Sequence, residues 1–527
     1  MGMYLDPGNS GFKEVISNEY VDKTGIIGLI NQCINTTDKL ICVSRPRRFG
    51  KSYTAKTLCA YYDHTCDSHE LFAEFEASTL KSYEEHINKY QVICIDVSQL
   101  MQEKSEMEIG ELIQRKVTDE LLLQYPKLAV DQSFSKTLFN AVELTGRKFV
   151  MIIDEWDAPI REEAQVSKKY LGFLKSIFKG TVSTTDTFAA VYMTGILPIK
   201  KDGTQSAVSD FREFTILDPQ RFAPYTGFNE DEVRRLCDKY HMDFSEAKRW
   251  YDGYSFPGAE SVYNPFSVMM AIKSGEFESY WKRTSVADPL ISFININIKK
   301  YNGQPSDLGA DILKLIAGEQ LKVNTSRFNN DFHTFNTEDD VLTLLTHLGY
   351  LAYDKATKRV RIPNEEVRLE FNELLEEPQY SKLSDLIIRS EKLLNDTLAG
   401  DGDAVAEAIK NVRATNYAPM YYNNEQSLRY AVKFAYIICV DRYMKVEELP
   451  SGSGLADVVY LPKSDTALPA LVVELKWDES ADSAIDQIKR NDYPAVLADY
   501  CGEILLVGIN YNSKTKEHTC KIERIDK

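Results

Sequence analysis

The segment that most constrains this chain is Ser44–Ser52, which reads Ser-Arg-Pro-Arg-Arg-Phe-Gly-Lys-Ser. An apolar run, Leu40–Val43, precedes it, and a helical pattern follows it. Strand, loop and helix in this order predict a phosphate-binding loop, in which backbone N–H groups and the helix N-terminus face the phosphates. Lys51 would reach the β- and γ-phosphate oxygens, and the Ser52 hydroxyl would ligate Mg²⁺. Arg45 stands where the general motif has its first glycine, so the assignment needs support from the rest of the chain.

Length and composition indicate a multidomain globular protein. The chain has 527 residues, of which 43% are hydrophobic and 27% charged, an ordinary globular balance. The net charge of −17 argues against a broad basic surface for nucleic acid, although it permits a local groove. We find no apolar run of membrane-spanning length and no signal peptide, and the nine cysteines lack disulfide or metal-ligand spacing. We therefore expect a cytoplasmic protein with reduced thiols and no membrane partner.

Four apolar runs in the first half of the chain alternate with helical patterns. Such runs predict a parallel sheet covered on both faces, with ligands bound outside the carboxyl ends of its strands. The predicted strands are Leu40–Val43, Val92–Val97, Phe149–Asp154 and Ala189–Thr194.

Acidic and polar residues follow the last two of these strands. Ile152–Glu155 has the form of a Walker B segment, in which Asp154 holds the Mg²⁺ of a nucleotide and Glu155 orients or deprotonates an attacking water. Two acids at a strand end could simply cap the next helix, but their position after a phosphate loop favours the nucleotide role. Thr194 would either sense the γ-phosphate, as in ATPases of the additional-strand class, or turn the chain before Gly195.

Together these segments resemble the AAA-ATPase-like family of bacterial proteins, whose hallmark is the loop Arg-Pro-Arg-Arg-Phe-Gly-Lys-Ser. The resembling segments are Tyr20–Thr24, Ser44–Ser52, Ile153–Pro159 and Thr194–Gly195. Within that family Arg45 is a regular feature, whereas Trp156 replaces a frequent Tyr and Pro198 a frequent basic or polar residue. The resemblance implies ATP and Mg²⁺ (or Mn²⁺) as cofactors, Glu155 as a catalytic residue, and Ser52 with Asp154 as metal ligands. The predicted ATP-binding residues are Arg45, Pro46, Arg47, Arg48, Phe49, Gly50, Lys51, Ser52, Tyr53, Asp154 and Thr194. No arginine finger is assigned.

The middle of the chain is mainly helical in pattern. Trp250–Tyr254 and Tyr263–Ser267 combine turn residues with large rings, which favours packing over ligand binding. Val341–Asn364 reads as a helix followed by a small hairpin, compatible with a winged-helix module. We expect this part to act as a lid over the nucleotide.

In the C-terminal part the predicted elements follow the order helix, three strands, helix, strand. This is the order of the core elements in the PD-(D/E)XK nuclease fold. The predicted elements are Asn424–Val440, Tyr443–Leu449, Leu455–Leu461, Ala470–Trp477, Ser480–Leu497 and Glu503–Ile509.

Three charged residues lie on the strands that carry the catalytic site in that fold. Glu474 and Lys476 share one face of a strand, and Asp457 lies on the preceding strand. Two carboxylates can hold Mg²⁺, which lowers the pKa of a bound water that Lys476 orients or helps deprotonate. Glu-X-Lys alone is common on exposed strands, but Asp457, the Gly452–Gly454 turn and Gln487 together favour a nuclease-type site.

The same region resembles the nuclease domain that commonly follows the ATPase-like module. The resemblance adds Glu425 and Gln487 as accessory residues, with Tyr493 downstream. The family has an Arg just before the Asp, whereas this chain has Leu455 and Ala456.

We thus predict an α/β multidomain protein with three parts. These are an additional-strand P-loop domain (1–226), a helical and winged-helix-like region (227–385) and an αβββαβ PD-(D/E)XK domain (386–527). The predicted function is an ATPase with a Mg²⁺-dependent nuclease acting on nucleic acid, DNA in preference to RNA. The alternative is an ATP-driven switch whose nuclease-like domain recognises nucleic acid or a partner without cleavage. Homo-oligomerisation stays open.

Overall fold

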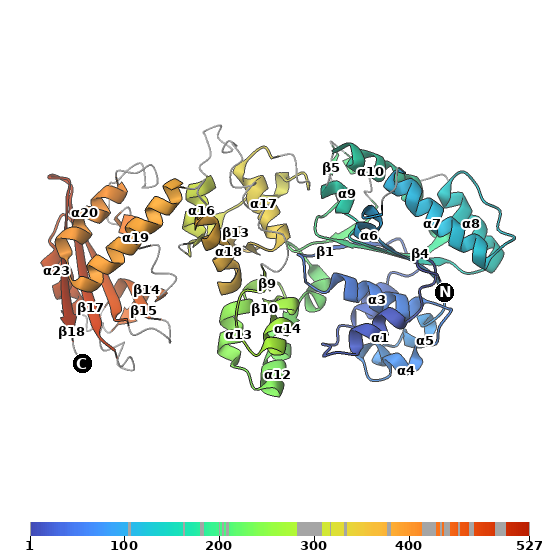
Figure 1. Cartoon of the computed structure of the whole chain (residues 1–527), viewed down its shortest axis with the longest axis horizontal. Coiled ribbons are helices and arrows are strands. Elements are labelled where there is room, and N and C mark those ends of the chain that lie inside the picture. Colours follow the sequence, from blue (N-terminus) through green and yellow to red (C-terminus); the bar gives the residue numbers. More distant parts are fainter. Residues whose placement is uncertain are drawn as a thin grey trace. The chain divides into compact units, whose positions relative to one another are not determined.

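The computed structural model of the chain (Figure 1) divides into two compact units, 1–306 with 322–367 and 307–321 with 368–527. The residues it describes are 2–103, 107–161, 164–179, 184–199, 201–202, 205–206, 210–281, 308–316, 318–330, 335–376, 381–413, 428–429, 431–432, 435–436, 443–451, 454–462, 468–490 and 502–525. In the described part of the chain, no helix is both long and apolar enough to cross a membrane.

A five-stranded parallel sheet forms the core of the first unit. Its order is β2 (Gln91–Asp96), β3 (Phe149–Asp154), β4 (Phe188–Gly195), β1 (Leu40–Ser44) and β7 (Arg212–Phe214). β4 therefore lies between β1, which leads into the phosphate loop, and β3, which carries the two acids. The four predicted strands are confirmed and the sheet fits a P-loop NTPase α/β fold. β7 was not predicted, because three residues are too short to show a strand period.

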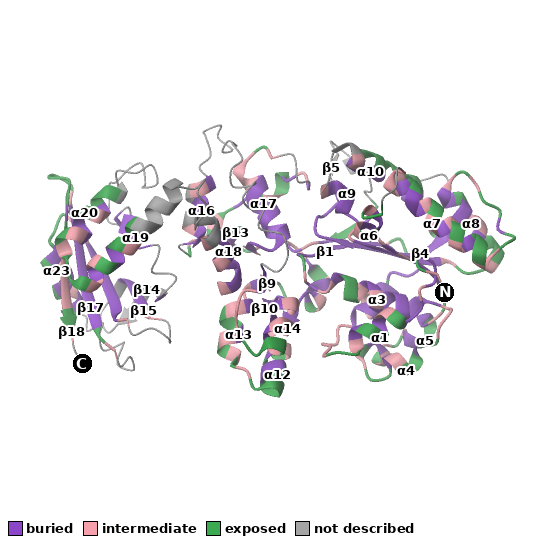
Figure 2. Ribbon diagram, viewed as in Figure 1, coloured by how far each residue is buried: buried purple, intermediate pink, exposed green. Residues whose placement is uncertain are grey.

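Helices cover this sheet, and its inner strands β1, β3 and β4 are buried along their whole length (Figure 2). Apolar strands of this kind form only where both faces of a sheet are covered. The helices of this part are α1 (Ser10–Ile16), α2 (Ile26–Asn31), α3 (Lys51–Tyr62), α4 (His69–Phe72), η1 (Glu76–Thr79), α5 (Tyr83–His86), α6 (Val97–Met101), α7 (Ile109–Gln124), α8 (Phe134–Thr145), α9 (Ala158–Arg161), α10 (Ala164–Phe178) and α11 (Thr184–Thr187). A two-stranded ribbon, β5 (Lys201–Asp202) with β6 (Gln205–Ser206), follows β4.

The middle of the chain combines helices with short strands. The helix-then-hairpin prediction is confirmed, since α17 (Glu338–Leu348) precedes the antiparallel pair β12 (Ala352–Asp354) and β13 (Arg359–Arg361). The aromatic segments pack as expected, with Tyr251, Tyr254 and Tyr263 each at most 1% exposed. The other elements described here are η2 (Gln220–Tyr225), β8 (Phe228–Asn229), α12 (Glu230–Tyr240), α13 (Phe244–Tyr251), β9 (Tyr254–Phe256), β10 (Ala259–Tyr263), α14 (Pro265–Ser274), β11 (Leu321–Lys322), η4 (Thr325–Arg327) and α18 (Glu365–Glu376).

The second unit contains a mixed five-stranded sheet. Its order is β14 (Tyr443–Ser451), β15 (Gly454–Pro462), β16 (Ala470–Trp477), β17 (Ile504–Asn512) and β18 (Glu517–Ile525). The first three strands form an antiparallel meander, β17 is parallel to β16, and β18 is antiparallel to β17. The strands were predicted except β18, whose polar sequence is typical of a sheet edge rather than a buried strand. The helices that can be described in this unit are α16 (Leu308–Ile316), α19 (Ser381–Ala399), α20 (Gly402–Arg413) and α23 (Ala481–Arg490). Most of the predicted helix Asn424–Val440 lies outside the described residues.

The two faces of this sheet have separate cores. Leu471, Val473 and Leu475 pack with residues of α19 and α20, whereas Val472 packs with Ile485 of α23. The strand alternation that was predicted around Glu474 is therefore present, and it places Glu474 on the α23 face. The predicted domain boundary at 385/386 falls inside α19, and the division between compact units lies at 367/368.

Candidate functional site

The predicted phosphate loop joins the end of β1 to the start of α3. Gly50, directly before the helix, has φ +78°, and Arg48 has φ +70°. Glycine takes this left-handed conformation without strain, whereas arginine does so at a cost of about 1–2 kcal/mol. The loop thus turns directly into α3, whose first-turn N–H groups have no acceptor within the helix and suit the binding of an anion.

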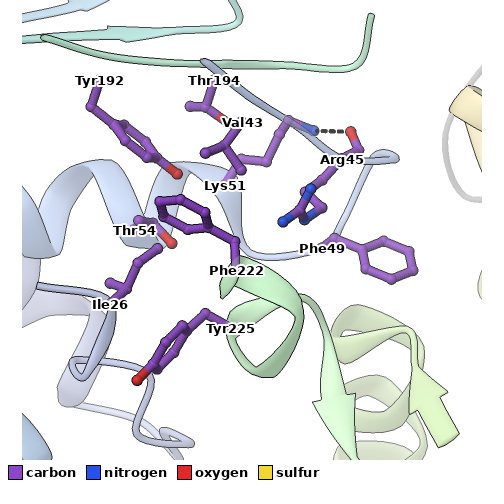
Figure 3. Close-up of a pocket in the computed structure, with 10 residues that line it drawn as sticks. All are labelled: Ile26, Val43, Arg45, Phe49, Lys51, Thr54, Tyr192, Thr194, Phe222 and Tyr225. Atoms are coloured by element: carbon purple, nitrogen blue, oxygen red, sulfur yellow. Dashed lines mark hydrogen bonds between the residues drawn. The ribbon is translucent and has the colours of Figure 1, made fainter. Parts of the chain in front are cut away.

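The side chain of Lys51 bonds the backbone of its own loop. Its Nζ donates to the carbonyl oxygens of Pro46 (3.1 Å) and Arg45 (3.3 Å), and it lies 3.4 Å from Oε1 of Glu155. Figure 3 shows the bond to Arg45. The ammonium thus lies between the loop and the acids at the end of β3.

Asp154 ends β3 beside the first turn of α3. It is 4% exposed, and burial raises its pKa to about 6, opposed by a hydrogen bond from Ser52. A carboxylate and a hydroxyl together offer the hard oxygen ligands that Mg²⁺ prefers. Asp96, which ends β2 opposite Asp154, also faces this edge but was not predicted. Its position near the end of an apolar run was visible in the sequence, but Val97 follows it and extends the predicted strand past it.

Glu155 is held by cations on both sides. It has φ +49°, and Oε2 accepts a bond of 2.8 Å from Nη2 of Arg161 while Oε1 faces Lys51. Burial acts to raise the pKa of Glu155, but Lys51 and Arg161 outweigh it and lower the pKa. Arg161 was not predicted either, because an arginine seven residues after the end of a strand belongs to no motif.

Arg45 and Thr194 are among the residues that line a small cavity (Figure 3). Its volume is about 10 Å³. Arg45 is 3% exposed, and its guanidinium donates to the carbonyl oxygens of Ser44 (2.9 Å) and Phe214 (3.2 Å). Burial lowers its pKa to about 10. In the position of the usual glycine, this arginine therefore fastens the end of β1 to β7.

A larger cavity of about 640 Å³ opens in front of the loop, a volume typical of small-molecule sites. Of the predicted ATP-binding residues, Arg47 to Tyr53 line it, as do Glu155, Arg161 and Asp96. Apolar side chains from the N-terminal motif, β8 and α14 also line it, next to the charged residues Glu19, Lys23 and Lys273; the apolar ones are Tyr20, Val21, Phe228, Phe266, Met269 and Met270. The cavity thus combines the polar, cationic phosphate loop with a lining of mixed character.

The N-terminal motif Tyr20–Thr24 supports this lining through its polar residues. Lys23 donates to both carboxylate oxygens of Glu232 at 2.7 Å, and Asp22 accepts from the backbone N–H of Glu76 at 2.7 Å. The motif therefore links the lining to α12 and η1.

The phosphate loop itself is bonded to the middle region of the same unit. Nη1 of Arg48 donates to the carbonyl oxygen of Tyr280 at 2.5 Å, and its guanidinium lies 4.0 Å from the ring centroid of Phe266. Phe49 is buried and packs edge-on against Tyr254, with ring centroids 5.3 Å apart.

The predicted nuclease residues come together on the α23 face of the second sheet. The register of β15 with β16 places Val458 opposite Val473, so Asp457 and Glu474 follow as the next pair. Oδ2 of Asp457 accepts from the N–H of Leu475 at 2.9 Å. Gln487 of α23 bonds both Glu474 and Lys476, whose Nζ lies 3.8 Å from Oε1 of Glu474.

An arginine that was not predicted joins this group. The guanidinium of Arg429 bonds Oδ1 of Asp457. The predicted accessory residue Glu425 and the downstream Tyr493 lie outside the described residues. Among the residues that are described, no group of three or more His, Cys, Asp and Glu side chains could hold a metal ion.

Comparison with protein families agrees with the geometry of the first site. Residues 8–205 match the family described as predicted AAA-ATPase. This segment contains β1–β4, the phosphate loop and both acids of β3, and it is therefore AAA-ATPase-like. The match does not extend to the second sheet.

Individual proteins similar to this chain share little of its sequence or structure. The chain is 22% identical over 523 residues to an Azotobacter chroococcum mcd 1 protein described as an uncharacterized protein in the vnfD 5′ region, which covers 94% of this chain and 93% of the relative. A Walker-type ATPase of Pyrococcus abyssi has TM-score 0.33 and 14% identity, covering 69% of this chain and 94% of the other. The ORC2 protein of Aeropyrum pernix, solved with ADPNP and ADP, has TM-score 0.29 and 12% identity, covering 71% and 98%. Scores this low do not indicate a shared overall fold.

Proposed function

We propose that the first unit binds ATP with Mg²⁺ in the 640 Å³ cavity and hydrolyses it. The observation that carries the proposal is the group formed by Lys51, Ser52, Asp154 and Glu155 around the N-terminus of α3. Phosphate would lie at the phosphate loop and the base against the apolar side chains of the cavity. The match of residues 8–205 to the predicted AAA-ATPase family supports the binding and hydrolysis of ATP.

Each residue of the group has a distinct proposed role. Lys51 exchanges its loop carbonyls for phosphate oxygens, which leaves Glu155 facing the nucleotide. Ser52 and Asp154 would hold Mg²⁺, which neutralises charge on the phosphates when bound. Glu155 accepts a hydrogen bond from the attacking water and orients it.

Measuring the affinity of Lys51→Ala for ATP tests the proposed contact between Lys51 and the phosphates. We expect calorimetry to show a loss of affinity of about 100-fold or more, since an ammonium bonded to phosphate is lost from a buried site. Lys56→Ala is the matched control, because Lys56 lies on the same helix but is 40% exposed and pairs with Glu14. Equal affinity in both variants would contradict the assignment.

For the second unit we propose a metal-dependent phosphodiesterase that acts on nucleic acid under the control of ATP. Asp457 and Glu474 would hold the metal, which lowers the pKa of a bound water, and Lys476 would orient that water. Their shared sheet face and the bridging Gln487 support this assignment.

One observation favours the alternative, an ATP-driven switch whose second unit binds nucleic acid or a partner without cleavage. Arg429 already supplies a positive charge to Asp457, at the position where a metal would bind. Titration of the protein with Mn²⁺ distinguishes the nuclease from the switch. Tight binding of Mn²⁺ that Glu474→Ala abolishes supports the nuclease. Absence of metal binding, or DNA cleavage that survives both Asp457→Ala and Glu474→Ala, would refute it.

A further inference from the structure

Each carboxylate oxygen of Glu155 contacts a different cationic side chain. Oε1 faces Nζ of Lys51 at 3.4 Å, and Oε2 accepts from Nη2 of Arg161 at 2.8 Å. The Arg161 contact is the shorter of the two and has hydrogen-bond geometry. Both Glu155 and Arg161 line the large cavity, so the pair faces the proposed nucleotide.

The two partners of Glu155 differ in what ATP would do to them. Lys51 lies in the phosphate loop, and the proposed function moves its ammonium onto phosphate oxygens. Arg161 ends α9, on the other side of the acid, and its bond to Oε2 does not compete with the loop. When Lys51 leaves, Oε1 becomes free to accept from a water while Arg161 still holds Oε2.

Arg161 is itself fixed by the buried framework at the end of β4. Its Nε lies 3.8 Å from Oδ2 of Asp157, which is fully buried and accepts from the N–H groups of Ile196 (3.2 Å) and Leu197 (2.9 Å). The guanidinium therefore has a defined position relative to the sheet, and its side chain is only 15% exposed.

The strained backbone of Glu155 makes this support necessary. At φ +49° the residue lies in the left-handed region, which costs an ordinary side chain about 1 kcal/mol or more. Such a conformation persists where surrounding contacts impose it. The N–H of Trp156 bonded to the carbonyl of Thr194 at 3.1 Å holds the backbone, and Arg161 holds the side chain.

We infer that Arg161 is a positioning residue for the proposed hydrolysis, holding Oε2 of Glu155 so that Oε1 points at the attacking water once Lys51 has bound phosphate. The inference rests on the proposed ATPase activity. It assigns Arg161 no contact with the nucleotide, so ATP affinity and turnover respond differently to its loss.

The test is a double-mutant cycle between Arg161→Ala and Glu155→Gln. We expect Arg161→Ala to leave the Kd for ATP within about 3-fold and to lower single-turnover hydrolysis about 10- to 100-fold, a part of what a positioned base contributes. In the Glu155→Gln background the same change should have little further effect, because the carboxylate it orients is gone. Arg161→Lys should recover part of the rate. Arg249→Ala, at an exposed residue of the same unit paired with Glu246, is the control and should change neither quantity.

Three results overturn the inference. They are an unchanged rate in Arg161→Ala, a loss that is undiminished in the Glu155→Gln background, and a fall in ATP affinity that accounts for the whole loss. If Arg161→Ala does not fold, Arg161→Gln replaces it in the cycle, since it keeps a hydrogen-bond donor without the charge. A wild-type protein that binds ATP but never hydrolyses it refutes the proposed ATPase activity, and the role of Arg161 with it. The three results above refute only the role of Arg161, because in each of them the wild-type protein hydrolyses ATP.

Discussion

Gly253, in the aromatic segment before β9, offers a steric test of how the middle region packs. A Cβ at this position would lie 2.0 Å from the carbonyl oxygen of Pro363 and 2.6 Å from its carbonyl carbon. The Gly253 carbonyl also accepts from Nη2 of Arg361 at 2.7 Å, so the two chain segments are pressed together. We predict that Gly253→Ala forces backbone movement, because the obstructing atoms belong to main chain.

The magnitude follows from comparison with Gly258, in the turn between β9 and β10. Both glycines have positive φ (+125° and +84°), but a Cβ on Gly258 meets nothing within 4 Å. Gly258→Ala should therefore cost only the conformational term, about 1–2 kcal/mol. Gly253→Ala adds a packing clash of about 1–3 kcal/mol, which gives about 2–5 kcal/mol in all.

Hydrogen exchange is the suitable assay, because a chain of two compact units has no single free energy of unfolding. Peptides covering β9 and β10 should lose more protection in Gly253→Ala than in Gly258→Ala, while β14–β18 stay unchanged in both. Equal loss in the two variants would refute the reasoning, since it would mean that the close approach to Pro363 does not exist.

Two further predictions concern contacts around the phosphate loop. A double-mutant cycle of Arg48→Ala and Phe266→Leu should give a coupling energy of about 0.5–2 kcal/mol from the hydrogen-exchange protection of α14, because the guanidinium lies over that ring. A coupling near zero would mean that this contact does not tie the phosphate loop to α14. Asp157→Ala should cost about 2–4 kcal/mol of local stability, since it leaves the buried N–H groups of Ile196 and Leu197 without their acceptor, and wild-type hydrogen-exchange protection of β4 in this variant would contradict this.

The core of the first site could be predicted because its residues follow one another in short motifs. Lys51, Ser52, Asp154 and Glu155 each sit at a strand end or helix start, and parallel strands bring such ends to one edge. Strand alternation also predicted that Glu474 and Lys476 share one face of their strand, which the structure shows to be the face that α23 covers.

Residues that act through tertiary packing could not be predicted in this way. Arg161 and Arg429 meet their carboxylate partners only because a turn or a helix brings them there. Arg45 was expected at the phosphates, yet its guanidinium turns inward to carbonyl oxygens of β1 and β7, and β7 itself is too short to be recognised. The sequence pattern shows which residues are unusual but not the direction in which a long side chain points.

Hydrolysis of ATP by Glu155→Gln tests the central claim most directly. The wild-type protein with Mg²⁺ should hydrolyse ATP, and the variant should bind ATP with unchanged Kd but turn it over at least about 100-fold more slowly, because the group that orients the water has lost its charge. Glu14→Gln, at an exposed residue paired with Lys56, should behave as wild type. Hydrolysis by Glu155→Gln at the wild-type rate, or a wild-type protein with no ATP bound at millimolar nucleotide, would contradict the account.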